Sequence, residues 1–221
     1  MVRVKVSGIR RVEDAFSAVR WGADAIAFGV GKRYPSEDFI SVEVAIQIIR
    51  QIPPLISKVL MTHLLQADEI INLCDQIGPD TLQLHSEILP MQIKIIRERR
   101  PYLRIFKSFH IVDEASVEYG VPYCQIVDAF VLDSVNEQTG AICGTGIVHD
   151  WKVSRRVVSR YPTPVILSGG LTPLNVREAM EKVKPYAVDS NTGLRDANGF
   201  KDHTKIHEFI NNAKEGFFSA D

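Results

Sequence analysis

Residues 165–173, with the sequence VILSGGLTP, have the composition of a turn that binds an anion. The three apolar residues that open the segment predict a strand buried on both faces. Gly169 and Gly170 allow the backbone to turn sharply and to approach a ligand closely. Thr172 and Pro173 are favoured at a helix N-cap and at the first helical position, so we predict a helix that begins at Pro173. The N–H groups at a helix start suit a phosphate, although a tight turn without a ligand would use the same residues.

A second short polar turn follows the last predicted strand, at residues 191–193. If the two strands are neighbours in a sheet, the N–H groups of both turns point toward one anion. We therefore expect a phosphate site formed by Ser168, Gly169, Gly170, Asn191, Thr192 and Gly193.

These turns belong to a chain in which buried strands and helices alternate eight times. The predicted strands are residues 2–6, 25–28, 56–62, 80–84, 103–107, 126–132, 165–167 and 186–188. The predicted helices are residues 12–21, 41–51, 67–77, 89–99, 113–119, 151–159, 173–182 and 201–213. Such alternation predicts a parallel sheet with right-handed crossovers. Eight units in 221 residues indicate an α/β fold with a single (β/α)8 TIM barrel over residues 1–221; a doubly wound open sheet is the alternative.

Polar residues gather where the predicted strands end, which is the face of a barrel that carries chemistry. The set comprises Lys5, Ser7, Asp38, Thr62, His63, His85, Lys107, His110, Asp133, Asp189, Asn191 and Thr192. Lys5 shares a face with Ser7, because alternate residues of a strand do so, and it is placed either to lower the pKa of nearby groups or to pair with Asp133. His110 and His149 are expected to be surface loop residues. No cofactor motif or metal-ligand spacing stands out, so no cofactor and no metal are expected.

Composition narrows the class of protein. The chain has a net charge of −1, which gives no sign of a nucleic-acid or acidic-lipid partner, so we expect a phosphorylated small molecule bound locally. Its three cysteines, Cys74, Cys124 and Cys143, are far apart, as is usual in a reducing cytosol. No apolar run approaches the roughly 18 residues of a membrane span, and no signal peptide opens the chain. We expect a cytoplasmic monomer or homodimer.

The order of short motifs along the chain resembles the phosphoribosylanthranilate isomerase family of tryptophan biosynthesis. VKVSGI at residues 4–9 is similar to that family's VKICGI, QLH at 83–85 to its QLH, and LDS at 132–134 to its LDS or LDT. LSGGLTP at 167–173 is similar to LSGGLNP, and the segment from Gly144 to Trp151 is partly similar to GTGKTFDW. Matches also occur at residues 13–15, 22–25, 188–193 and 201–202, so the resemblance covers the whole chain.

The resemblance implies an Amadori rearrangement of a phosphorylated aminoaldose to an aminoketose. Such a reaction needs an acid that opens the sugar ring and a base that removes the proton from carbon 2. By resemblance, Asp133 is the acid. The family's base is the cysteine of KICG, but this chain has Ser7 at that position. A hydroxyl is much harder to ionise than a thiol, so Ser7 needs a neighbouring base. His63 is a candidate replacement because imidazole titrates near neutrality, although a loop histidine is often only bonded to the backbone.

A second departure lies in the loop after the second predicted strand. Where the family has an arginine that holds the anthranilate carboxylate, this chain has Asp38, which would repel that carboxylate. Lys32 or Arg33 could substitute. The other expected substrate contacts are Lys5, His85 and Lys107, each of which could instead be structural. A third departure is Ile147-Val148-His149 in place of KTF.

Three hypotheses therefore stay open at this stage. The chain is a working isomerase with a relocated base and carboxylate anchor, a paralogue acting on a different phosphosugar or nucleotide, or a non-catalytic phosphosugar-binding protein. The changes at Ser7 and Asp38 predict poor turnover of phosphoribosylanthranilate, and they predict that Ser7→Cys with Asp38→Arg would raise it.

Overall fold

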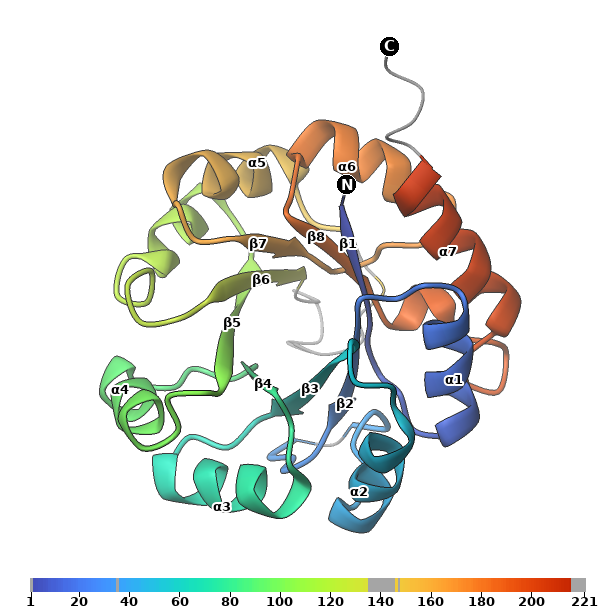
Figure 1. The fold of residues 1–221 in the computed structure, drawn as a ribbon. Helices are drawn as coiled ribbons and strands as arrows, with labels where there is room; N and C mark the ends of the chain where they lie inside the picture. The colour runs from blue at the N-terminus through green and yellow to red at the C-terminus, as the bar shows by residue number, and fades with distance from the viewer. Residues whose placement is uncertain (1, 35, 135–145, 147, 216–221) are drawn as a thin grey trace.

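Eight parallel strands close into a barrel in the computed structural model, in the order of the sequence (Figure 1). The structure describes residues 2–34, 36–134, 146 and 148–215. The strands are β1 (Arg3–Val6), β2 (Ala25–Gly29), β3 (Ser57–Thr62), β4 (Thr81–Leu84), β5 (Arg104–Ile111), β6 (Ala129–Ser134), β7 (Val165–Leu167) and β8 (Ala187–Ser190). The pairing of β1 with β8 closes the ring, which confirms the predicted barrel and excludes the open sheet.

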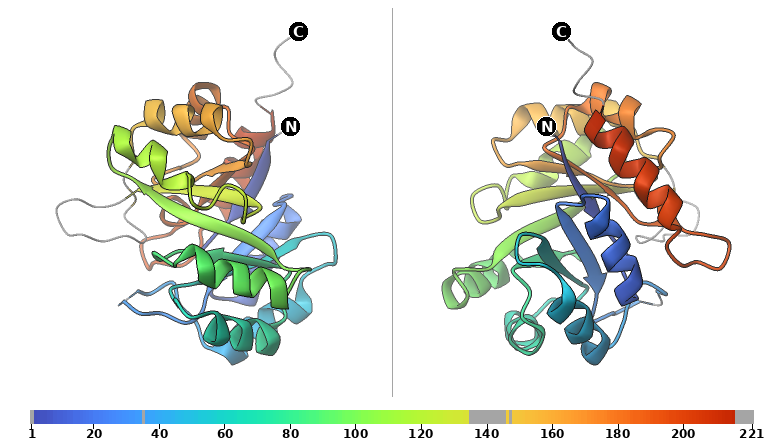
Figure 2. Two further views of the ribbon diagram at one scale, coloured as in Figure 1. Left: turned by 90° about the vertical axis from the view of Figure 1, so that its left-hand side faces the viewer. Right: turned by 45° about the vertical axis from the view of Figure 1, so that its right-hand side comes forward.

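Helices surround the barrel on its outside (Figures 1 and 2). They are α1 (Val12–Arg20), α2 (Val42–Gln51), α3 (Ala67–Ile77), α4 (Pro90–Arg99), α5 (Trp151–Arg160), α6 (Val176–Val183) and α7 (His203–Glu215), with the 3-10 helices η1 (Glu114–Gly120) and η2 (Thr192–Leu194). Local sequence sets their ends: Ser41 accepts a hydrogen bond from the N–H of Val44 at the start of α2, and Gly78 ends α3 with a φ of 75°. None of the described helices is long and apolar enough to cross a membrane.

Alternation along the strands separates two cores. One set of strand residues packs outward against the helices, including Val4, Val6 and Leu167. The other set points into the barrel, where Ala129, Val131, Ile166 and Ala187 form a small apolar cluster. Two residues further along each strand, on the same inward face, lie Asp133 on β6, Ser168 after β7 and Asp189 on β8. The barrel interior is therefore apolar at its base and polar at the carboxyl ends of its strands.

The helix after β7 begins later than the sequence predicts. It starts at Val176 rather than Pro173, and Asn175 precedes it. The N–H of Thr172 donates to Oδ1 of Asn175 at 2.8 Å, and Nδ2 of Asn175 donates to the carbonyl of Gly170 at 3.0 Å. The side chain of Asn175 thus holds the residues between the glycine pair and α6 in a turn. The prediction that Thr172 caps the helix was wrong.

Candidate active site

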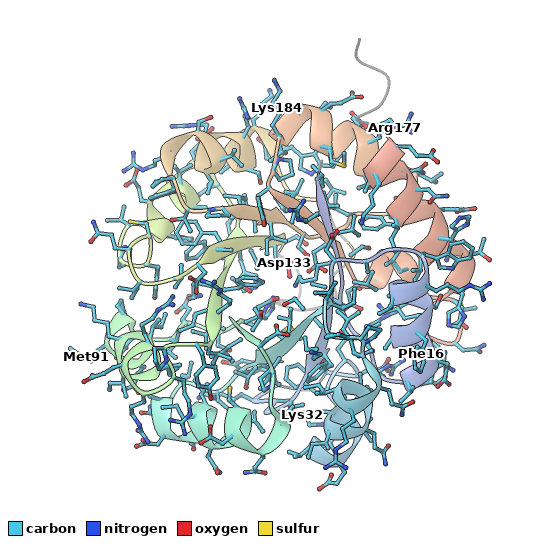
Figure 3. All side chains as sticks on the ribbon, viewed as in Figure 1. Phe16, Lys32, Met91, Asp133, Arg177 and Lys184 are labelled. Atoms are coloured by element: carbon cyan, nitrogen blue, oxygen red, sulfur yellow. The ribbon has the colours of Figure 1, made fainter. Side chains whose placement is uncertain are left out.

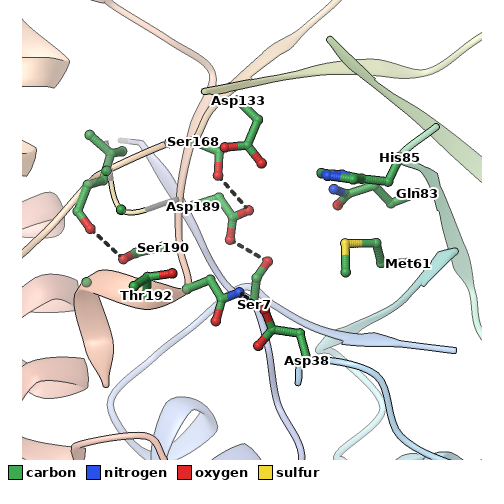
Figure 4. A pocket seen from close by; sticks show the side chains of 16 residues that line it. Ser7, Asp38, Met61, Gln83, His85, Asp133, Ser168, Asp189, Ser190 and Thr192 are labelled. Carbon is green, nitrogen blue, oxygen red and sulfur yellow. Dashed lines mark hydrogen bonds between the residues drawn. The ribbon is translucent and has the colours of Figure 1, made fainter. Parts of the chain in front are cut away.

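A small, tight cavity opens at the carboxyl ends of β1, β6, β7 and β8. Its volume is about 40 Å³ (Figure 4). Its lining includes eleven of the residues discussed above, namely Ser7, Asp38, His85, Asp133, Ser168, Gly169, Gly170, Asp189, Asn191, Thr192 and Gly193. The structure therefore brings together the expected phosphate-binding residues, the expected acid and the serine at the family's base position. The labelled Asp133 lies at the centre of the barrel in Figure 3, while Phe16, Met91 and Arg177 lie at the rim.

Asp189 is the centre of a hydrogen-bonded network at the floor of this cavity. One carboxylate oxygen accepts a hydrogen bond from Oγ of Ser7 at 2.7 Å. The other lies 2.9 Å from Nζ of Lys5 and accepts from Oγ of Ser168 at 3.2 Å. Lys5 also donates to Oε1 of Gln83 at 2.6 Å. Lys5 pairs with Asp189 and not with Asp133, whereas its charge does lower the pKa of Asp133, which is the other role expected for it. The sequence placed Asp189 at the end of β8 but assigned it no role.

Asp133 carries the strongest electrostatic signal of an acid. The pKa of its carboxyl is raised to about 7, chiefly by desolvation and to a smaller extent by the negative charge of Asp189. The N–H of Ser134, 2.8 Å from Oδ1, and the ammonium of Lys5 act in the opposite direction. A carboxyl with such a pKa is partly protonated at neutral pH and can donate a proton.

The two glycine turns have the geometry of a close approach. Gly169 and Gly170 have φ values of 76° and 65°, which side chains rarely adopt. A Cβ on Gly193 would lie 2.1 Å from the carbonyl oxygen of Leu171, so the two turns touch through backbone. Ser190 ties them together, because its Oγ donates to that same carbonyl at 2.6 Å. Only glycine at position 193 permits this arrangement.

Asp38 does not face the cavity as an unpaired carboxylate. It is buried, and its carboxylate is bound by the guanidinium of Arg195 and by Nδ2 of Asn191, the latter at 2.9 Å. Asn191 in turn accepts hydrogen bonds from Nζ of Lys201 at 2.7 and 2.8 Å. The pKa of Lys201 is lowered to about 7, chiefly by burial. The expectation of simple repulsion by Asp38 omitted Arg195, which lies only two residues beyond the turn at 191–193.

This pair also changes the expected effect of Asp38→Arg. The new guanidinium would meet Arg195 in a buried site and would leave Asn191 without its acceptor. The substitution would therefore destabilise the site rather than restore it.

A second and much larger cavity, of about 930 Å³, adjoins the first on the side of β4 and β5. His85 lines both. The wall of the larger cavity is aromatic and carries charges of both signs: Tyr34, Phe109 and Tyr123 line it together with Arg33, Lys107, Glu87 and Glu118. Lys107 points to the opposite face of β5 from Ser108, and its buried ammonium lies 5.1 and 5.4 Å from the ring centres of Phe109 and Tyr123. Burial lowers the pKa of Lys107 to about 8. Arg33 lines this cavity, whereas Lys32 lines neither.

His63 lies outside both cavity linings. Its ring is fully buried between Phe39, at a centroid distance of 4.4 Å, and His85, at 5.6 Å. Burial, followed by the charges of His110 and Arg33, lowers its pKa to about 4. The imidazole is neutral at pH 7 and is a weak base there, so its placement argues against the role of base.

The remaining predictions are of smaller weight. His110 and His149 are half-buried rather than surface residues; Nε2 of His149 lies 2.6 Å from Oγ of Ser154. Cys143, Gly144, Thr145 and Ile147 lie outside the described residues. Among the described residues, no group of three or more histidine, cysteine, aspartate or glutamate side chains is arranged to hold a metal ion.

Comparison with known proteins identifies the family of this chain. The family model for N-(5'-phosphoribosyl)anthranilate (PRA) isomerase matches residues 4–212. The chain is 45% identical over 219 residues to N-(5'-phosphoribosyl)anthranilate isomerase 2 of Methanosarcina mazei, covering 99% of this chain and 97% of that protein. It is 36% identical over 210 residues to N-(5'-phosphoribosyl)anthranilate isomerase of Methanocella arvoryzae, covering 95% and 97% of the two chains.

Solved structures give the same result. Phosphoribosyl anthranilate isomerase from Thermotoga maritima superposes with a TM-score of 0.86 at 33% identity, covering 97% of this chain and 100% of that chain. A phosphoribosyl anthranilate isomerase in complex with reduced 1-(o-carboxyphenylamino)-1-deoxyribulose 5-phosphate superposes with a TM-score of 0.82 at 32% identity, with the same coverage. The closed barrel and the full-length matches agree, and this chain belongs to the N-(5'-phosphoribosyl)anthranilate isomerase family of barrel enzymes.

Proposed function

We propose that this protein isomerises N-(5'-phosphoribosyl)anthranilate to the corresponding aminoketose phosphate. The observation that carries the proposal is a pair of carboxyl groups, Asp133 and Asp189, in one cavity with unlike surroundings. Desolvation favours the protonated form of Asp133, whereas an ammonium and two hydroxyls surround Asp189. Two carboxyls in contrasting environments are the arrangement that separates a general acid from a general base.

The phosphate of the substrate is assigned to the two glycine turns. Ser168, Gly169 and Gly170 form one side of the tight cavity and Asn191, Thr192 and Gly193 the other. Their backbones meet at Gly193, where a Cβ would clash with the carbonyl of Leu171. A phosphate held by these turns would leave the sugar carbons beside Asp133 and Ser7, which line the same cavity.

The aromatic amine is assigned to the larger cavity. The larger cavity shares His85 with the tight one and offers aromatic rings to the anthranilate ring. Arg33 and Lys107 are its candidates for binding the carboxylate, although Glu87 and Glu118 line the same cavity. This places the carboxylate anchor in the wide half of the barrel mouth, away from Asp38. Arg195 is already engaged with Asp38 and is not required for that role.

The chemistry then follows from the acid and a base at carbon 2. Protonation of the ring oxygen by Asp133 opens the ribose and leaves an iminium group at carbon 1. Removal of the proton on carbon 2 converts the iminium to an enolamine, which becomes the ketone when carbon 1 is protonated and the enol hydroxyl loses its proton. The structure thus favours the hypothesis of a working isomerase with a relocated base and a relocated carboxylate anchor.

The alternative is a paralogue that acts on a different phosphorylated aminosugar. The neutralised Asp38–Arg195 pair favours it, because this part of the site presents no net charge to an aromatic carboxylate. Such an enzyme would keep the tight cavity and the acid, and would differ in what the larger cavity binds.

Steady-state turnover of phosphoribosylanthranilate, generated in the cuvette and followed by the loss of its fluorescence, tests the proposal. We expect kcat within the ordinary enzymatic range, on the order of 1–10³ s⁻¹. Tight binding of the reduced product analogue without turnover would support a non-catalytic binding protein. If the protein neither bound the analogue nor turned over phosphoribosylanthranilate, the result would favour the paralogue. The same measurement tests the poor turnover that the sequence alone predicts.

A further inference from the structure

We propose that Asp189 is the terminal acceptor of the proton that leaves carbon 2, and that the hydroxyl of Ser7 passes this proton to it. This inference rests on the proposed isomerase function and names the base that the reaction requires. It gives a role to a carboxylate that the sequence singled out only by position, and it explains how a serine can occupy this place.

The direction of one hydrogen bond is the starting point. Oγ of Ser7 donates its hydrogen to Oδ1 of Asp189, with 2.7 Å between the oxygen atoms (Figure 4). A hydroxyl has one hydrogen and two lone pairs, so a serine that donates in this way keeps its lone pairs available for a second group. Ser7 and Asp189 both line the tight cavity. The hydroxyl is therefore ready to receive a proton from a substrate while it gives up its own.

The surroundings of Asp189 keep the carboxylate charged and fixed. It is 3% exposed, and its second oxygen lies 2.9 Å from the ammonium of Lys5. Gln83 holds that ammonium from the other side at 2.6 Å, so the cation is positioned from two directions. Ser168 adds a hydrogen bond at 3.2 Å to the same oxygen. The oxygen that faces Ser7 is thus left as the one that accepts a proton.

The transfer balances without any further reactant. As the C–H bond at carbon 2 breaks, its proton bonds to Oγ of Ser7, and the original hydroxyl proton moves to Oδ1 of Asp189. The electron pair of the broken bond forms the double bond between carbons 1 and 2, and the electrons of the C=N bond return to nitrogen, which neutralises the iminium. The reverse relay delivers a proton to carbon 1, and Asp189 is again a carboxylate. The enol hydroxyl loses its proton to solvent, and solvent returns a proton to Asp133, which closes the cycle.

The relay removes the difficulty posed by a lone serine. An isolated hydroxyl would have to become an alkoxide before it could take a proton, which is unfavourable near neutral pH. With Asp189 behind it, Ser7 exchanges one proton for another and is never an alkoxide. The final acceptor of the proton is then a carboxylate, a group that is available as a base at neutral pH.

The test compares Asp189→Asn, Ser7→Ala and Ser7→Thr with a control, Asp14→Asn. Asp14 is an equally buried carboxylate on α1, bound by Arg11 and His203 outside the cavity lining. Each variant is assayed for kcat with phosphoribosylanthranilate carrying hydrogen or deuterium at carbon 2. Affinity for the reduced product analogue is measured by calorimetry, which also reports whether the site is intact. A further variant, Asp189→Ala, is assayed with and without added formate.

We expect Asp189→Asn and Ser7→Ala to lower kcat by about 10²–10⁴-fold, the size of one general-base contribution, while affinity for the analogue changes less than about tenfold. Ser7→Thr keeps a hydroxyl and should retain most of the rate, and Asp14→Asn should match the native rate. The isotope effect on kcat should rise in Asp189→Asn, and formate should restore part of the rate of Asp189→Ala. A purely structural role for Asp189 would produce neither of these two effects.

Near-native kcat in Asp189→Asn would overturn the inference and leave the isomerase function standing. Near-native kcat in Ser7→Ala would overturn the relay. A rate loss that is explained by lost analogue binding, with no formate rescue, would also count against it. Absence of turnover by the native protein would instead overturn the proposed function itself, and the inference with it.

Discussion

The two halves of the barrel mouth differ in size and in chemistry. The half formed by β6, β7, β8 and β1 encloses about 40 Å³, and backbone and fixed polar side chains fill the rest. The half formed by the ends of β4 and β5 encloses about 930 Å³, bordered by aromatic side chains and by charged side chains of both signs. Figure 4 shows the tight cavity, with His85 and Gln83 across it from Ser168 and Asp189.

The difference in size suggests a division of roles: the tight half performs the steps that the reaction always requires, and the wide half binds the part of the substrate that can vary. Phosphate grip and proton transfer require fixed distances, which the tight half provides through closely packed turns and the Asp189 network. The substituent on nitrogen takes no part in proton transfer, so the wide half can vary without loss of the chemistry. We therefore expect substitutions in the tight half to change kcat or stability, and those in the wide half to change KM.

The largest effect is expected from Asp133→Asn. The amide cannot donate a proton to the ring oxygen as an acid does, so kcat should fall by about 10²–10⁴-fold. Because the pKa of Asp133 is raised to about 7, native kcat should fall as pH increases through that value and the acid form is lost. A pH profile of kcat from 5 to 9, with circular dichroism to confirm folding, checks both points. Near-native turnover in this variant would exclude Asp133 as the acid.

Arg195→Met tests the edge of the tight half. It leaves the carboxylate of Asp38, whose side chain is only 5% exposed, without its cationic partner. Loss of one partner of a buried ion pair costs about 3–5 kcal/mol in unfolding free energy, and we expect the lower end because Arg195 is itself partly exposed. Urea denaturation measures the loss. Adding Asp38→Asn to Arg195→Met should recover most of it, and a single variant as stable as the native protein would show that the pair is not structural.

Gly169→Ala and Gly78→Ala form a matched pair that separates backbone strain from crowding. Their φ values are 76° and 75°, so both alanines carry a similar strain of about 1–2 kcal/mol. A Cβ on Gly169 would lie 2.8 Å from the backbone nitrogen of Ser134, whereas a Cβ on Gly78 meets nothing within 4 Å. Both should lower stability, but only Gly169→Ala should weaken binding of inorganic phosphate, by about tenfold or more. Equal phosphate affinities would contradict the assignment of the anion site.

The sequence predicted the regular parts of this molecule well. Apolar strand runs and helix caps placed all eight strands, and α3 and β7 have the predicted ends. The barrel also followed, because eight alternating units fit one closed parallel sheet. Residues directly after a predicted strand, such as Asp133 and Ser168, could be assigned to the site from that position, and both line the tight cavity.

The predictions that were wrong concerned contacts between side chains that are far apart in the sequence. Asp38 and Arg195 are 157 positions apart, and Ser7 and Asp189 are 182 apart, so no local pattern reveals either contact. The sequence offered His63 as a replacement base or as a loop histidine bonded to the backbone, but packing against Phe39 buries its ring. The start of α6 was misplaced because Asn175 uses its side chain to close a turn rather than to leave Thr172 as the cap. Electrostatic partners must be seen in three dimensions.

The smallest effect is expected in the wide half, from Lys107→Met. Methionine keeps much of the volume of the lysine stem but removes the charge that we assign to the aromatic carboxylate. We expect KM for phosphoribosylanthranilate to rise about three- to tenfold, with kcat nearly unchanged, because the charge contacts the substrate equally before and during proton transfer. The pKa of Lys107 is about 8, so the ammonium is present below that pH and lost above it. Native KM should therefore rise as pH passes through 8, and KM of Lys107→Met should not. Lys58→Met, at the opposite end of the barrel where Lys58 pairs with Asp80, is the control and should behave as the native protein. If kcat fell and KM did not change, Lys107 would belong with the proton-transfer residues, and the division between the two halves would be wrong.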